Sequence, residues 1–139
     1  MDLVLENHAV LQYNKLSEER EVSVMHALAP QQLDSVMNAF VTECKNLFGE
    51  KLSDVLLFGS YARGDYHEES DIDVMILLDM STEEVGKQFD GICKIASDID
   101  LAHNVNLIPM LRSKNDYEYR KVFGFYRNVD AEGVSQYAR

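Results

Sequence analysis

The sequence predicts an α+β domain with one small sheet flanked by helices. Amphipathic helical stretches and apolar runs of strand length follow one another in the order helix, strand, strand, helix, strand, helix. The chain has 139 residues, 46% hydrophobic and 27% charged, which suits one globular domain with a single core. We expect this domain over residues 30–139, after a weakly structured arm over residues 1–29.

The first helix is expected to begin at Pro30, because proline suits the first turn, and to stop at Gly49. Its apolar residues recur at helical spacing: Leu33, Met37, Phe40, Val41, Cys44, Leu47 and Phe48. The apolar run 55–58 predicts a short buried strand. A turn region over 59–70 and a second apolar strand over 71–78 follow it.

Ser81 and Glu84 form a capping-box pattern, which predicts the start of the next helix. Residues 104–111 predict a third strand, and Pro109 places it at an edge of the sheet because proline has no N–H to donate. The tail, residues 113–139, is expected to form one or two helices with a break near Gly124.

The charge balance limits the partners. The chain carries 24 acidic and 13 basic residues, a net charge of −11, so its surface repels a phosphate backbone and nucleic-acid binding is not expected. An acidic protein that handles nucleotides would need divalent cations as bridges. No stretch approaches the roughly 18 apolar residues of a membrane helix, and no basic-then-apolar secretion pattern is evident at the start. We therefore expect a cytoplasmic protein.

Asp71 and Asp73 lie two residues apart in the second predicted strand, so their carboxylates should project from the same face. Two carboxylates on an apolar strand repel each other and are costly to desolvate, and a hard divalent cation removes that penalty. Magnesium prefers a few carboxylates together with waters and phosphates. The pair is therefore a candidate magnesium site, with room for the two metal ions used in nucleotidyl transfer.

Gly59 follows the first predicted strand and would let the backbone approach a ligand closely. The hydroxyl of Ser60 could face an anion, and Arg63 could contact a phosphate or pair with an acid. Each feature alone is weak, since most Asp-x-Asp pairs are surface turns and this Gly-Ser lacks the lysine of a P-loop. Together, Gly-Ser after a strand, ten residues and Asp-x-Asp in a second strand form a specific pattern.

This pattern resembles the signature of the DNA polymerase β-like nucleotidyltransferase superfamily. The fuller form FGSYARGD…SDIDVMI is similar to the minimal nucleotidyltransferases (MNT proteins), over roughly residues 30–134. The resemblance implies a nucleotidyltransferase fold with a mixed sheet flanked by helices. It also implies that Asp71 and Asp73 are catalytic metal ligands and that Gly59 and Ser60 hold the triphosphate of ATP. Arg63 is added to this nucleotide-binding set from its position one turn after Ser60.

The resemblance also implies a helical partner of the HEPN type. In characterised pairs of this kind, the MNT protein is an antitoxin that adds AMP from ATP to a HEPN ribonuclease toxin. The first hypothesis is therefore transfer of NMP, most simply AMP, to a hydroxyl such as a tyrosine of that partner. The alternative is a catalytically degenerate antitoxin that neutralises the partner by binding alone.

The sequence departs from the family at the third carboxylate, which members usually place on the strand after the helix. Here that strand carries Asn104 and Asn106. Asparagine can coordinate a metal but brings no charge and cannot act as a base. Asp98 and Asp100 are substitutes if the strand starts early, although their run is more simply a helix end. The acceptor, homo-oligomer formation and the role of residues 1–24 stay open.

Overall fold

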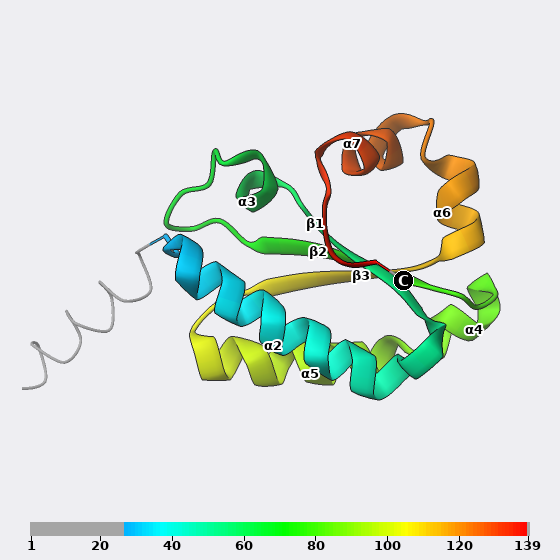
Figure 1. Cartoon of the computed structure of the whole chain (residues 1–139), viewed down its shortest axis with the longest axis horizontal. Helices are drawn as coiled ribbons and strands as arrows, with labels where there is room; N and C mark the ends of the chain where they lie inside the picture. The colour runs from blue at the N-terminus through cyan, green and yellow to red at the C-terminus, as the bar shows by residue number, and fades with distance from the viewer. Residues whose placement is uncertain (1–26, 139) are drawn as a thin grey trace, which may run out of the picture.

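The computed structural model describes residues 27–138, and these form a mixed four-stranded sheet between two layers of helices (Figure 1). The predicted α+β class is confirmed. Residues 1–26 of the predicted arm lie outside the described residues. The segment 1–24, whose role the sequence left open, lies within this part. The elements are α2 (Pro30–Phe48), the 3-10 turn η1 (Gly49–Lys51), β1 (Leu52–Phe58), α3 (Ser60–Arg63), β2 (Ile72–Leu78), α4 (Thr82–Gly86), α5 (Phe89–His103), β3 (Leu107–Ser113), α6 (Lys114–Arg120), α7 (Gly124–Glu132) and β4 (Val134–Ala138).

The sheet has the strand order β3-β2-β1-β4. Strand β1 runs antiparallel to β2 and β4, and β2 runs parallel to β3. The register places Asp73 beside Phe58 of β1 on one side and Ile108 of β3 on the other. Strand β3 lies at an edge, as Pro109 predicted.

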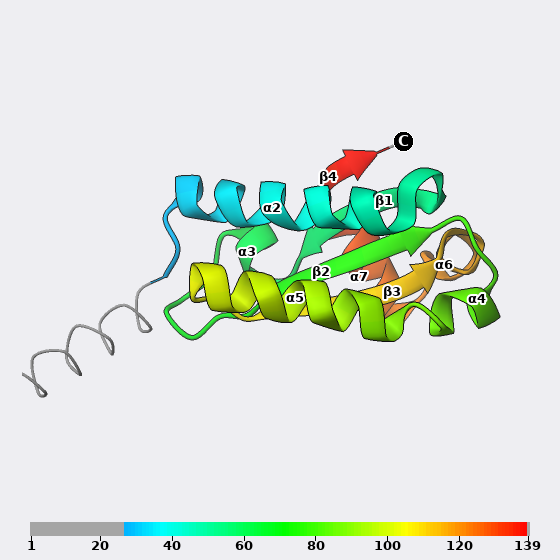
Figure 2. The same cartoon turned by 90° about the horizontal axis from the view of Figure 1, so that it is seen from below.

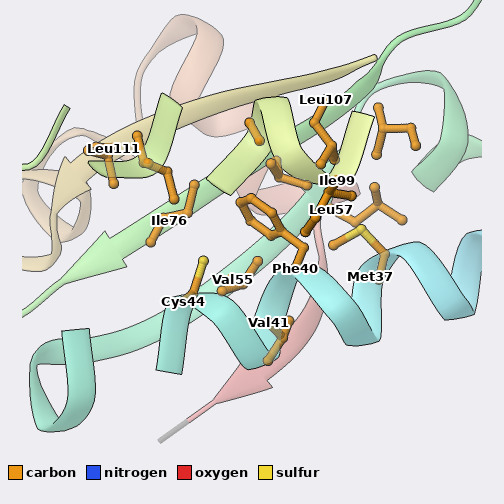
Figure 3. Close-up of a cluster of buried hydrophobic side chains, with 14 of the residues drawn as sticks. Met37, Phe40, Val41, Cys44, Val55, Leu57, Ile76, Ile99, Leu107 and Leu111 are labelled. Carbon is orange, nitrogen blue, oxygen red and sulfur yellow. The ribbon is translucent and has the colours of Figure 1, made fainter. Parts of the chain in front are cut away.

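Helices α2 and α5 lie side by side and cover one face of the sheet (Figure 2). Phe40 and Cys44 of α2 point into the main core between these helices and the strands (Figure 3). Burial raises the pKa of the Cys44 thiol to about 12, and both Cys44 and Cys93 are free cysteines. Leu47, which the helical spacing assigned to the buried face of the first helix, is 44% exposed.

Helices α6 and α7 cover the other face, where a second core contains Phe58, Met75 and Val129 (Figure 1). The hydroxyl of Tyr117 on α6 donates a hydrogen bond to Asp130 of α7 at 3.0 Å, which ties the two helices together. The predicted break near Gly124 is present, and this glycine has a φ of 43°. Helix α7 is thereby held over the end of the sheet where β1 finishes.

The tail prediction was wrong for its last residues, which form strand β4 instead of helix. Strand β4 pairs antiparallel with β1, and the Ser135 hydroxyl donates to Asp54 Oδ1 at 2.7 Å. Its five residues show no period that marks a strand, because the element depends on pairing with a partner about 80 residues away in the sequence.

The helix predicted after Ser81 is divided into α4 and α5. Ser81 caps α4 as expected, since its Oγ accepts a hydrogen bond from the Glu84 N–H at 3.2 Å. Among the helices of residues 27–138, none has the length and apolar character that crossing a membrane requires.

Candidate active site

The two aspartates lie at the start of β2 and point away from the main core. Ile72 and Val74 are buried in the core beneath α2 and α5, so side-chain alternation along β2 directs Asp73 to the face of α6 and α7. Asp73 is half-buried and Asp71, one residue before the strand, is exposed. Asp71 and Asp73 lie close enough for the charge of Asp71 to act on Asp73, and they border different hollows at the start of β2.

The pKa of Asp73 is raised above its ordinary value of 3.8. Desolvation is the largest cause and the negative charge of Asp71 is the second, while the positive charge of Arg63 opposes them. The folded chain thus disfavours the ionised form of Asp73 relative to a free aspartate, and a nearby cation would offset this.

Gly59 connects β1 to α3 with a φ of 74° and a ψ of −155°, a conformation that is essentially restricted to glycine. A Cβ at this position would overlap the Asp73 carboxylate. The backbone therefore passes directly against the acid, which no other residue would allow. Ser60 begins α3 next to it, and the Arg63 N–H closes the turn by donating to the Gly59 carbonyl at 3.0 Å.

Arg63 pairs with two acids, which is the second of the two roles that the sequence allowed it. Its Nε lies 3.2 Å from Asp65 Oδ2, and its Nη1 lies 3.1 Å from Glu132 Oε2 at the end of α7. Glu132 was not among the site residues predicted from the sequence, because 69 residues separate it from Arg63.

A hollow of about 340 Å³ lies between α3, the ends of the strands and α7. Its lining joins the predicted Gly59, Ser60, Arg63 and Asp73 to Phe125, Asn128 and Glu132 of α7. A second hollow of about 340 Å³ is lined by Asp71, Asn106 and the loop 68–70. Asp73 thus borders the first hollow and Asp71 the second, so a ligand on either side could approach the pair.

Of the four candidates for a third metal ligand, Asn106 is the one with a hydrogen bond to the Asp71 carboxylate. Asn106 Nδ2 donates to Asp71 Oδ1 at 2.8 Å, and the β2–β3 register continues to place Asn106 level with Asp71. Ile108, the neighbour of Asp73, is apolar. Within residues 27–138, no group of three or more Asp, Glu, His or Cys residues is arranged to hold a metal ion.

The other three candidates belong to α5 and its end. Asp98 pairs with Lys94 at 2.9 Å, and Asp100 Oδ1 accepts the Leu107 N–H at 2.8 Å. Asn104 is the C-cap of the helix, with a φ of 53°. The run 97–100 therefore belongs to the C-terminal part of α5 and does not start the following strand.

The donor set fits a hard divalent cation. Two carboxylates and one amide are oxygen donors of the kind that Mg²⁺ accepts, and the open hollows leave space for waters and phosphate oxygens. A neutral Asn106 would stabilise the cation less than a third carboxylate would.

The raised pKa of Asp73 predicts a pH-dependent effect of Asp73→Asn on stability. Because the folded-state pKa lies above the unfolded one, the ionised group lowers the free energy of unfolding as pH rises from 3.8 through the folded pKa. Without added metal, Asp73→Asn should therefore unfold at a higher temperature than the wild type at pH 7, and the difference should shrink towards pH 3.5. Thermal unfolding followed by circular dichroism tests this, and equal midpoints at pH 7 would contradict it.

Comparison with known proteins identifies the family of this chain. The model of the nucleotidyltransferase domain family matches residues 37–125, which include Gly59, Ser60, Asp71 and Asp73. A relative from Methanocaldococcus jannaschii, named "putative protein adenylyltransferase", is 32% identical over 72% of this chain and 93% of its own length. A second relative of the same name and organism is 39% identical over 60% of this chain and 82% of its own.

A solved complex of an AMPylated Shewanella oneidensis HEPN toxin with its MNT antitoxin is also similar. The identity is 17%, the TM-score is 0.44, and the match covers 78% of this chain and 73% of that one. The family match covers more than half of the chain, and it includes both halves of the motif that line the hollows. The chain belongs to the nucleotidyltransferase domain family.

Proposed function

We propose that this protein transfers AMP from ATP to a hydroxyl group of a protein, with Mg²⁺ bound by Asp71 and Asp73. The observation that carries the proposal is that the Asp73 carboxylate occupies the space a side chain at Gly59 would need, in a hollow that Ser60 and Arg63 also line. A triphosphate there would lie between the motif that suits anions and the acids that suit cations.

Each residue has a separate task in this reaction. Gly59 lets the phosphates approach the chain, while Ser60 and Arg63 offer donors to them. Asn106 holds the Asp71 carboxylate in position through its 2.8 Å hydrogen bond. When bound, Mg²⁺ would neutralise charge on the triphosphate and stabilise the departing pyrophosphate. The acceptor oxygen forms a bond to the α-phosphorus, the bond between the α-phosphorus and the bridging oxygen breaks, and the acceptor proton leaves to solvent.

The choice of a protein acceptor is supported by the names of the two archaeal relatives, both protein adenylyltransferases. The resemblance of the motif to MNT proteins favours a HEPN-type helical partner, with a tyrosine as the acceptor, in a cytoplasmic toxin–antitoxin pair. Neutralisation of that partner by contact alone is the second candidate, and a specific observation favours it. Ile108 and Asn106 occupy the positions beside the aspartates where a third carboxylate would be expected.

The test is calorimetric titration of the full chain with ATP, with and without Mg²⁺, followed by incubation of the chain and a HEPN-type partner with α-labelled ATP. We expect magnesium-dependent binding and transfer of the label to the partner. Binding without transfer would favour the contact-only function. No binding under any condition would refute the nucleotide site.

A further inference from the structure

The ion pair between Arg63 and Glu132 connects the two walls of the hollow that contains Asp73. Arg63 ends the short helix α3, and Glu132 is the last residue of α7. Their 3.1 Å contact is long-range in the sequence, and both side chains line the hollow, with exposed fractions of 43% and 34%. The contact therefore lies where a bound triphosphate would need the guanidinium.

Arg63 is surrounded by more acidic groups than it can neutralise. Asp65 and Glu132 accept its hydrogen bonds, and its charge also acts on Asp73. The carboxylates hold the Nε and Nη1 donors of Arg63, so a phosphate that binds these donors must displace a carboxylate from them.

Glu132 is the better fixed of the two acidic partners. Asp65 lies two residues after Arg63 and is 63% exposed, so it moves with the same loop. Glu132 ends a helix whose last turn carries no basic residue, and a carboxylate at a helix C-terminus gains from a nearby cation. The next residue, Gly133, closes the helix through a 2.7 Å hydrogen bond to the Val129 carbonyl, and Val129 is buried in the second core.

We propose that Glu132 is a positioning residue that holds Arg63 in the nucleotide-free protein and thereby weakens the binding of the triphosphate. Nucleotide binding requires the guanidinium to exchange Glu132 for a phosphate. Loss of the Glu132 charge should therefore lower the free-energy cost of moving Arg63 onto a phosphate. This inference rests on the proposed function, because it takes the hollow as the triphosphate site.

The experiment compares wild type with Glu132→Gln in titrations with ATP and with inorganic triphosphate, both with Mg²⁺. Because exposed pairs of this kind are weakly coupled, we expect tighter binding by about threefold to fivefold for both ligands. Inorganic triphosphate lacks base and ribose, so an equal gain assigns the effect to the phosphates. Asp116→Asn is the matched control, since it removes one charge from the exposed Arg120–Asp116 pair of α6, and it should leave binding unchanged.

A further variant separates the role of Arg63 from a general change in charge. In an Arg63→Gln background, Glu132→Gln should no longer tighten binding, because the group that it holds is absent. A gain that persists there would show only a less acidic hollow and would overturn the proposal. Weaker or unchanged binding by Glu132→Gln alone would also overturn it.

Failure of the inference is distinguishable from failure of the proposed function. If wild type and Glu132→Gln bind ATP equally well with Mg²⁺, the nucleotide site stands and only the role of Glu132 is refuted. If neither protein binds ATP, the nucleotide site and the inference fail together.

Discussion

Asp73→Asn is expected to abolish magnesium-dependent ATP binding and to lower the rate of AMP transfer by about 10³-fold or more, the scale of loss when a central electrostatic group is removed. Asparagine keeps the size of the side chain but removes the charge that would hold the cation. The measurements are calorimetric titration with ATP and Mg²⁺ and transfer of an α-labelled nucleotide to the partner.

Asp73→Asn is expected to lose transfer activity and to gain thermal stability. The same substitution should raise the unfolding temperature at pH 7, so an inactive variant cannot be dismissed as unfolded. Asp116→Asn, which removes an acid from an exposed pair on α6, should retain full transfer. A variant at Asp73 that still transfers AMP at more than a tenth of the wild-type rate would contradict the assignment.

The same variant distinguishes the two candidate functions. If the protein neutralises a HEPN-type partner by contact alone, Asp73→Asn should still suppress the partner's ribonuclease activity. If neutralisation requires AMP transfer, suppression should be lost together with the labelling of the partner. Assay of that ribonuclease activity with each purified variant provides the comparison.

Most of the fold could be predicted because its elements carry local signals. Pro30, the helical spacing of α2 and the Ser81 cap each mark a boundary through the chemistry of a few neighbouring residues. Strand β1 begins at Leu52, three residues before the predicted start at Val55, because Ser53 and Asp54 give its first half a polar pattern. Strand β4 has no comparable signal, since only its pairing with β1 makes it a strand.

The residues of the candidate site also divide into those with a local sequence signal and those that only tertiary contacts identify. Gly59, Ser60, Asp71 and Asp73 could be proposed from two short motifs whose spacing follows from a strand, a turn and a second strand. The choice of Asn106 over Asn104 required the parallel register of β2 and β3, which no periodicity reveals. Glu132 required the packing of α7 over the sheet, which depends on tertiary contacts alone.

Gly59→Ala is expected to be the most damaging of the small substitutions. The new methyl group would overlap the Asp73 carboxylate, and the backbone conformation at this residue is one that alanine adopts at a cost of about 1–3 kcal/mol. Relief of the overlap must move either the β1–α3 turn or the carboxylate. A displacement of about 1 Å at a reacting centre can cost about 10²-fold in rate, so we expect at least that loss in AMP transfer.

Gly64→Ala is the matched control for the backbone strain. Gly64 also has a positive φ, 86°, but a Cβ there meets no atom within 4 Å. It should therefore lower the free energy of unfolding by about 1–2 kcal/mol, the cost of a left-handed alanine, while transfer persists at a near wild-type rate. Urea unfolding and the transfer assay measure both effects. If Gly64→Ala lost as much activity as Gly59→Ala, the defect would follow from strain in the α3 turn. If Gly59→Ala alone is inactive, the close approach of the backbone to Asp73 is what the reaction requires.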